Sequence, residues 1–136
     1  MAFTGAWAHT ATMDLNQITL SVTDFAAGVA FYQRLGLKLI VSARREYARF
    51  ELPSGSTTLS LHLCDAVPAN GPVLYLEVED VDAAYRRLSA VGVAFDTEPT
   101  DEPWRWREAR FRDPFGNRFC LYHAGLERRF PPWRLS

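Results

Sequence analysis

Side chains that could bind or transform a ligand are concentrated in one stretch, PWRWREARFRDPFGNRFCLYH, residues 103–123. Trp104 and Trp106 can stack on a planar molecule, or they can pack at the entrance of a strand. Glu108 could act as a cavity acid or pair with an arginine. Cys120 would be a nucleophile only with a base and a lowered pKa; neither is visible, which favours a small buried filler. The stretch therefore suggests a nucleic-acid surface, the wall of a small-molecule pocket, or an ordinary hairpin.

The charge of the chain argues against nucleic acid. Lys and Arg number 15 and Asp and Glu number 16, so the formal net charge is -1, whereas nucleic-acid binders usually carry a basic excess. Within the stretch, strand alternation divides Arg105 and Arg107 from Arg110 and Arg112, so they form no single basic stripe. We expect no nucleic-acid partner.

An internal repeat would position these side chains. Leu20-Ser-Val-Thr-Asp24 aligns with Leu76-Glu-Val-Glu-Asp80, and Gly36 aligns with Gly92, without gaps at an offset of 56 residues (80 minus 24). In each copy, alternating apolar residues predict a strand. A helix follows, which the aspartate can cap and the glycine can end.

Each copy is predicted to continue with three more strands, which makes it a βαβββ module. These strands are expected at 37–43, 47–52 and 57–63 in the first copy and at 94–97, 106–112 and 117–123 in the second. The helix would cover the apolar face of each sheet, and the other face is chemically mixed. Two sheets that curl with their mixed faces inward would enclose a cavity for a small ligand. We predict an α+β fold with the helices outside.

The predicted boundaries follow from this repeat. A single domain of paired modules spans residues 13–124, with modules 13–64 and 71–124, after an N-terminal extension at 1–12. Residues 125–136 contain Pro131-Pro132, which a helix does not tolerate. We expect this C-terminal segment, called the strap below, to be extended and to pack on this subunit or a partner.

Motifs in both copies carry a family resemblance. They are Ile18-Thr-Leu-Ser-Val-Thr-Asp24, Phe31-Tyr32 with Leu35-Gly36-Leu37, Asp80-Val-Asp-Ala-Ala84 with Gly92, and the turn Asp113-Pro-Phe-Gly-Asn117. Over roughly residues 14–122 the sequence resembles the vicinal oxygen chelate superfamily, which includes glyoxalase, bleomycin-resistance and extradiol-dioxygenase proteins. The resemblance implies the glyoxalase/bleomycin-resistance fold.

The resemblance also locates the positions where metal-dependent members hold their ion. These members typically use a His or Gln on the first strand of each half and a Glu on the last, and the four positions fall on Gln17, Ser60, Val73 and Cys120. Valine has no donor atom, and a serine and a lone thiol make no recognisable site. The resemblance therefore implies that the usual metal site is missing. We expect no cofactor; a divalent metal in a rearranged site with His62 is the disfavoured alternative.

The start of the opening stretch resembles metal-free bleomycin-resistance proteins more narrowly. Their Pro-Trp-Gly-x-Arg-Glu run corresponds to Pro103-Trp104 followed by Arg107-Glu108, with Arg105 in the place of the glycine. This departure bears on the loop conformation and weakens any transfer of a specific drug.

The candidate ligand-binding residues share the mixed faces of the two predicted sheets or the strand entrance beside them. No catalytic role is assigned to them, and His62 in particular is read more readily as a satisfied structural histidine. The set comprises Gln17, Thr19, Ser60, His62, Tyr75, Trp104, Trp106, Glu108, Arg110, Cys120 and Tyr122.

The resulting hypothesis is a homodimeric protein that binds a small, partly aromatic organic molecule without a metal. The alternatives are a divalent-metal-dependent lyase, isomerase or dioxygenase with an unusual site, and a vestigial cavity that serves as an assembly surface. Cys64 and Cys120 are too few for a disulfide framework, and the leader MAFTGAWAHTAT lacks the features of a signal peptide. No apolar run is long enough to span a bilayer. These features predict a cytoplasmic protein without a membrane partner.

Overall fold

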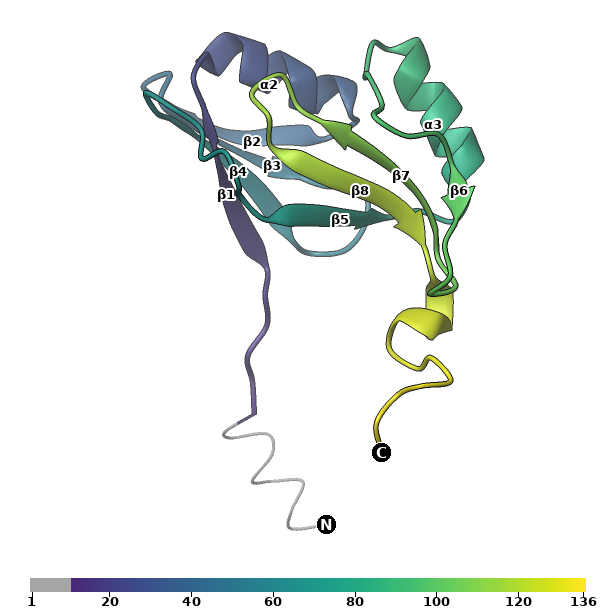
Figure 1. Cartoon of the computed structure of the whole chain (residues 1–136). Coiled ribbons are helices and arrows are strands. Elements are labelled where there is room, and N and C mark those ends of the chain that lie inside the picture. Colours follow the sequence, from purple (N-terminus) through teal and green to yellow (C-terminus); the bar gives the residue numbers. More distant parts are fainter. Residues whose placement is uncertain (1–10) are drawn as a thin grey trace.

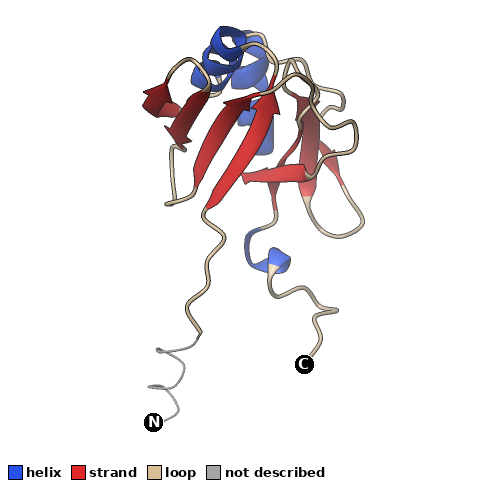
Figure 2. Ribbon diagram, turned by 90° about the vertical axis from the view of Figure 1, so that its left-hand side faces the viewer, coloured by secondary structure: helices blue, strands red, loops and turns tan. Residues whose placement is uncertain are grey.

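The computed structural model describes residues 11–136 as two βαβββ halves, each a four-stranded mixed sheet with one helix (Figure 1). The first ten residues of the expected N-terminal extension lie outside the described residues. The two helices lie on one side of the molecule, and both terminal segments leave at the opposite end (Figure 2). The predicted α+β fold with outer helices is confirmed.

The halves repeat the same order of elements. The first consists of β1 (Gln17–Val22), α2 (Phe25–Arg34), β2 (Lys38–Ala43), β3 (Tyr47–Glu51) and β4 (Thr58–Leu63). The second consists of β5 (Val73–Glu77), α3 (Val81–Ala90), β6 (Thr100–Asp101), β7 (Arg107–Arg112) and β8 (Arg118–His123), and the 3-10 turn η1 (Gly125–Arg128) follows.

The two sheets have equivalent strand orders, β1-β4-β3-β2 in the first sheet and β5-β8-β7-β6 in the second. In each sheet the first and last long strands are parallel, with Leu20 beside Leu61 and Leu76 beside Leu121. The remaining pairs are antiparallel. A helical crossover is the usual way to join parallel neighbours, which places α2 and α3 over their own sheets.

The helix boundaries follow the sequence signals in both halves. The side chain of Asp24 accepts a hydrogen bond from Ala27 N at 3.0 Å, and that of Asp80 accepts one from Ala83 N at 2.9 Å. Gly36 and Gly92 both have φ of 98°, the left-handed conformation that ends a helix. The repeat is thus preserved in the details of the backbone.

Residues of both halves contribute to one continuous apolar core. Tyr32 of α2 is fully buried and donates a hydrogen bond of 2.7 Å to Asp113 Oδ2 in the turn between β7 and β8. The amide of Asn117 in the same turn donates to Ser21 O at 3.0 Å. The turn therefore docks the second half onto the first half.

One predicted strand is wrong. Residues 94–97 form no ladder and contribute only an isolated bridge between Phe95 and Phe111, while β6 lies a few residues later. The backbone N–H groups of two of these residues bond to the same carbonyl, that of Arg110. Pro99, two residues later, has no backbone N–H group and cannot donate a hydrogen bond to a ladder. The segment thus pairs with β7 irregularly.

No helix within residues 11–136 has the length and apolar character needed to cross a membrane.

Candidate ligand-binding site

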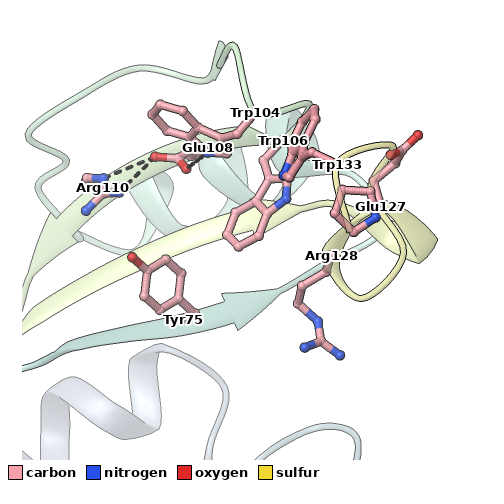
Figure 3. A pocket seen from close by; sticks show the side chains of 9 residues that line it. Tyr75, Trp104, Trp106, Glu108, Arg110, Glu127, Arg128 and Trp133 are labelled. Carbon is pink, nitrogen blue, oxygen red and sulfur yellow. Dashed lines mark hydrogen bonds and ion pairs between the residues drawn. The ribbon is translucent and has the colours of Figure 1, made fainter. Parts of the chain in front are cut away.

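An open cleft of about 280 Å³ lies on the face of the second sheet that points away from α3 (Figure 3). We call it the aromatic cleft. Its lining comes from β5, from β7 and the loop before it, and from the strap. The lining residues are Tyr75, Trp104, Trp106, Glu108, Arg110, Glu127, Arg128, Pro131 and Trp133.

Stacked rings form the wall of the cleft. Trp106 stacks on Tyr122 with ring centroids 4.6 Å apart, and Tyr75 meets both rings edge-on at 6.0 and 5.7 Å. Each such pair stabilises by about 0.5–1.5 kcal/mol beyond its buried area, so the rings hold one another in place. Tyr75 is 49% exposed and Trp104 is 42% exposed, which leaves ring surface open to a ligand.

Glu108 is a buried carboxylate with its hydrogen bonds satisfied. The indole Nε1 of Trp104 donates to Glu108 Oε2 at 2.9 Å. The guanidinium of Arg110 donates to Oε1 through Nε at 3.1 Å and Nη2 at 3.0 Å. A buried charge held by an opposite charge and a further donor is well compensated. Glu108 is therefore engaged in holding Trp104 and Arg110 in the lining of the cleft.

Cys120 lies beneath the cleft and does not line it. It is fully buried in a small cluster with Tyr122 and Ala124, against which Trp106 packs. Burial raises the pKa of the Cys120 thiol to about 12, and the charge of Glu108 adds to this effect. The thiol is protonated at neutral pH, whereas a nucleophilic cysteine needs to be ionised.

The candidate residues of the first half lie on the other sheet. Gln17 Oε1 accepts a hydrogen bond of 3.2 Å from Thr58, and Thr19 is exposed on β1. Ser60 is fully buried, and its hydroxyl is 2.7 Å from Tyr47 Oη. His62 is exposed, with Nδ1 3.6 Å from Cys64 Sγ. The cleft of one chain therefore contains none of these first-half residues.

The donor atoms at the four metal positions of the resemblance do not fit a metal ion. Gln17 and Ser60 are hydrogen-bonded within the first sheet, Val73 offers only carbon, and Cys120 is a lone, fully buried thiol. Across residues 11–136, no group of three or more His, Cys, Asp or Glu side chains is placed to hold one. We therefore derive no chemistry through a metal.

The strap supplies lining residues that the sequence did not assign to the cavity. Trp133 is 56% exposed beside Trp106, and Glu127, Arg128 and Pro131 complete that side (Figure 3). The sequence predicted an extended strap that packs on this subunit or a partner. Its first four residues instead form the 3-10 turn η1, and Phe130 and Trp133 remain more than half exposed.

A second missed group, Tyr47 and Arg49, lies on the mixed face of the first sheet. Arg49 Nε donates to Tyr47 Oη at 2.9 Å. The hydrogen bond with Ser60, together with the charge and hydrogen bond of Arg49, lowers the pKa of Tyr47 against the opposing effect of burial. The buried Ala48 and Phe50 alternate with these two residues, and this alternation was the available signal.

Arg105 occupies the glycine position of the bleomycin-resistance motif in a glycine-like conformation. Its φ is 73°, which non-glycine residues rarely adopt. Its guanidinium forms an ion pair of 3.0 Å with Glu127 of the strap. The loop thus keeps the backbone shape that glycine favours and links the strap to the entrance of β7.

The other arginines of the opening stretch pair with carboxylates. Arg107 bonds to Asp82 of α3 and to Asp101, each at 2.9 Å, and Arg112 bonds to Asp96 at 2.9 Å. These pairs leave no continuous basic surface along β7.

Comparisons with known proteins agree on one family. The family model described as Glyoxalase/Bleomycin resistance protein/Dioxygenase superfamily matches residues 14–121. The uncharacterised protein YraH of Bacillus subtilis (strain 168) is 35% identical over 125 residues, which cover 81% of this chain and 98% of YraH.

Solved structures show the same fold. A superfamily member from Sphaerobacter thermophilus DSM 20745 is 27% identical with a TM-score of 0.69, over 83% of this chain and 98% of that one. A bleomycin-binding protein crystallised with bleomycin is 23% identical with a TM-score of 0.66, over 82% of this chain and 98% of that one. The latter likeness concerns the fold alone.

Proposed function

The chain belongs to the Glyoxalase/Bleomycin resistance protein/Dioxygenase superfamily, and on that premise we propose that it binds a small, partly aromatic organic molecule in the aromatic cleft without a metal ion. The observation that carries this proposal is the ring wall of Tyr75 and Trp106, which pack on the buried Tyr122, with Trp104 and Trp133 exposed beside them. Preorganised rings offer a large contact area at a small entropic cost. A bleomycin-binding protein of the same fold was crystallised with its ligand, so the scaffold can hold an organic molecule.

The chemistry of the groups in and beneath the cleft favours binding over catalysis. Glu108 is neutralised by Arg110, and Cys120 keeps its proton. A general base needs a free basic atom near the reacting proton, and a nucleophile needs to be ionised or activated. Neither group meets these conditions, so the role proposed is sequestration of the ligand.

We propose further that the protein is a homodimer. The mixed faces of the two sheets carry ligand-type side chains but do not share the cleft of one chain. A second copy that brings its first sheet against the second sheet of its partner would add Gln17, Ser60 and His62 to the cleft. Analytical ultracentrifugation measures the oligomeric state, and a protein that is monomeric at micromolar concentration would contradict this part of the proposal.

The cellular setting that we propose is the cytoplasm. Both Cys64 and Cys120 are free thiols, which suits a reducing compartment such as the cytoplasm. The arginine–carboxylate pairs of β7 support the absence of a nucleic-acid partner.

A thermal-shift screen against planar aromatic compounds, followed by calorimetry, tests the function. A ligand at 100 times its Kd stabilises the folded state by about 2.7 kcal/mol. Trp106→Leu is expected to weaken binding by about tenfold or more, since it removes the central ring of the wall. Phe130→Leu is the control, because this strap aromatic is 55% exposed and lies outside the lining. An equal loss of ligand affinity in the two variants would contradict the proposal, and so would a screen in which no compound stabilises the protein.

Metal analysis of protein purified without chelators is the second test. Stoichiometric metal that disappears in the Gln17→Ala and His62→Ala variants would replace the proposal with a metal-dependent lyase, isomerase or dioxygenase. The expected result is no stoichiometric metal, because the donor set at the four superfamily positions does not fit one.

A further inference from the structure

The charges around the aromatic cleft differ in whether they already have a partner. Glu108 is bound by Arg110 and Trp104 and is 4% exposed. Glu127 is bound by Arg105, and its other oxygen, Oε2, has no hydrogen-bond partner but is shielded from solvent. A ligand that enters the cleft therefore meets no carboxylate that is both accessible and free.

Arg128 is in the opposite situation. It is exposed at the end of η1 and lines the cleft, and it forms no ion pair or side-chain hydrogen bond with any residue from 11 to 136. In Figure 3 no dashed line reaches its guanidinium, whereas two lines join Arg110 to Glu108. The cleft thus presents an unused positive charge and fork of N–H donors next to its aromatic wall.

The neighbouring carboxylate, Glu77, forms no ion pair with Arg128. Glu77 is close enough for Arg128 to contribute to lowering its pKa, but Glu77 Oε2 accepts hydrogen bonds of 2.8 Å from both Ala124 N and Gly125 N. Its carboxylate is committed to holding the start of the strap. Arg128 therefore remains available to a ligand.

We infer that the ligand is a planar aromatic acid, whose ring stacks on the wall of Trp106, Tyr75 and Trp133 while its carboxylate pairs with Arg128. This inference rests on the proposed function and specifies its ligand class. A guanidinium matches a carboxylate with two parallel hydrogen bonds, which fixes the orientation of the ligand as well as adding affinity. A cavity of about 150 Å³ accommodates benzene, so a cleft of about 280 Å³ suits one or two fused rings with an acidic substituent.

The alternative is that the cleft prefers a cationic ligand. The rings alone would allow this, because aromatic faces attract cations. In this cleft a cationic ligand would lie beside Arg110 and Arg128, and the accessible acids are already paired. Repulsion from Arg128 would offset the attraction of the rings. The charge of the lining therefore selects the acid over the amine.

Three probes with the same ring test the inference: 2-naphthoate, 2-naphthamide and 2-naphthylmethylamine. Calorimetric titration of the full-length protein at low salt should show naphthoate binding about tenfold more tightly than naphthamide, the scale of one charge-assisted hydrogen bond. The amine should bind most weakly. The advantage of naphthoate should shrink as salt is raised, because the pair is at an open site.

Substitutions then assign the effect to one residue. Arg128→Gln should erase the difference in affinity between naphthoate and naphthamide, and Arg128→Lys should restore part of that difference. Arg129→Gln is the matched control, because Arg129 is the adjacent strap arginine, packs on Phe130 at 5.7 Å and lies outside the lining. It should behave as wild type.

The outcomes separate this inference from the proposed function. If naphthamide binds as tightly as naphthoate, or the amine binds best, the acid preference is overturned and aromatic binding stands. If the preference persists in Arg128→Gln, the role of Arg128 is overturned. If none of the probes binds the wild-type protein, both ideas fail.

Discussion

Arg105 combines a conformation that suits glycine with an ion pair that glycine cannot make. Its φ of 73° places the Cβ in an unfavourable position, and its guanidinium is 3.0 Å from Glu127 of the strap. Two substitutions separate the contributions. Arg105→Ala removes the ion pair and keeps the strain, and Arg105→Gly removes both.

The magnitudes follow from the exposure of the pair and the backbone conformation. The side chains of Arg105 and Glu127 are 55% and 35% exposed, so the ion pair contributes about 0.2–1 kcal/mol. The left-handed conformation costs a non-glycine residue about 1–2 kcal/mol, and glycine costs about 0.5–1 kcal/mol in extra chain entropy. The glycine variant should therefore be more stable than the alanine variant by about 0.5–1 kcal/mol and close to wild type.

Urea denaturation of the three proteins measures these differences, and the corresponding shift in Tm between the variants is about 2–4 °C. Glu127→Gln is the control for the ion pair, because it leaves the backbone of Arg105 unchanged. An alanine variant as stable as the glycine variant would refute the assignment of strain to this position.

Two further predictions concern titratable groups outside the loop. In the native protein at about pH 8, iodoacetamide should label Cys64 and spare Cys120, because Cys120 is buried with a pKa of about 12; mass spectrometry that finds both labelled would contradict this. Hydrogen bonds from two backbone N–H groups, with the charges of His123 and Arg128, outweigh burial and lower the pKa of Glu77 in the folded state. The stability it contributes is present above its ordinary pKa of 4.5 and is lost as the pH falls through the lowered value. Glu77→Gln should flatten the acid limb of a plot of urea midpoint against pH, and an unchanged limb would show that Glu77 does not contribute.

The fold was predictable because each half repeats strong local signals. Asp24 and Asp80 cap their helices and Gly36 and Gly92 end them, as the aligned sequences indicated. These signals depend on backbone hydrogen bonds and conformations that are set within a few residues. The prediction of a strand at 94–97 was wrong because the pairing of this segment depends on where a distant strand, β7, directs its donors and acceptors.

The site was predictable only in part, and the limit has a physical cause. Alternation predicted that Trp106, Glu108 and Arg110 share one face, since side-chain direction in a strand has a period of two, and all three side chains line the aromatic cleft. Alternation does not specify which strand lies opposite or what covers a face. The strap has no periodicity, so the position of Trp133 depends on tertiary packing and could not be derived from its sequence.

The repeat extends to the polar side chains of the mixed faces. This matters for the net charge of a site formed between the first sheet of one copy and the second sheet of another. In the first sheet Arg49 pairs with Ser60 in register and donates to Tyr47, two residues earlier on the same strand. In the second sheet Arg110 pairs with Cys120 in register and donates to Glu108, also two residues earlier.

The equivalent arginines thus have different partners. Arg110 is neutralised by the carboxylate of Glu108, whereas Arg49 is bonded to the phenol of Tyr47, which carries no charge while it keeps its proton. If two copies bring first and second sheets together, the enclosed space gains the positive charge of Arg49 in addition to that of Arg128. Duplication followed by this one difference in partner would make the cavity cationic, which is the property that an aromatic acid requires.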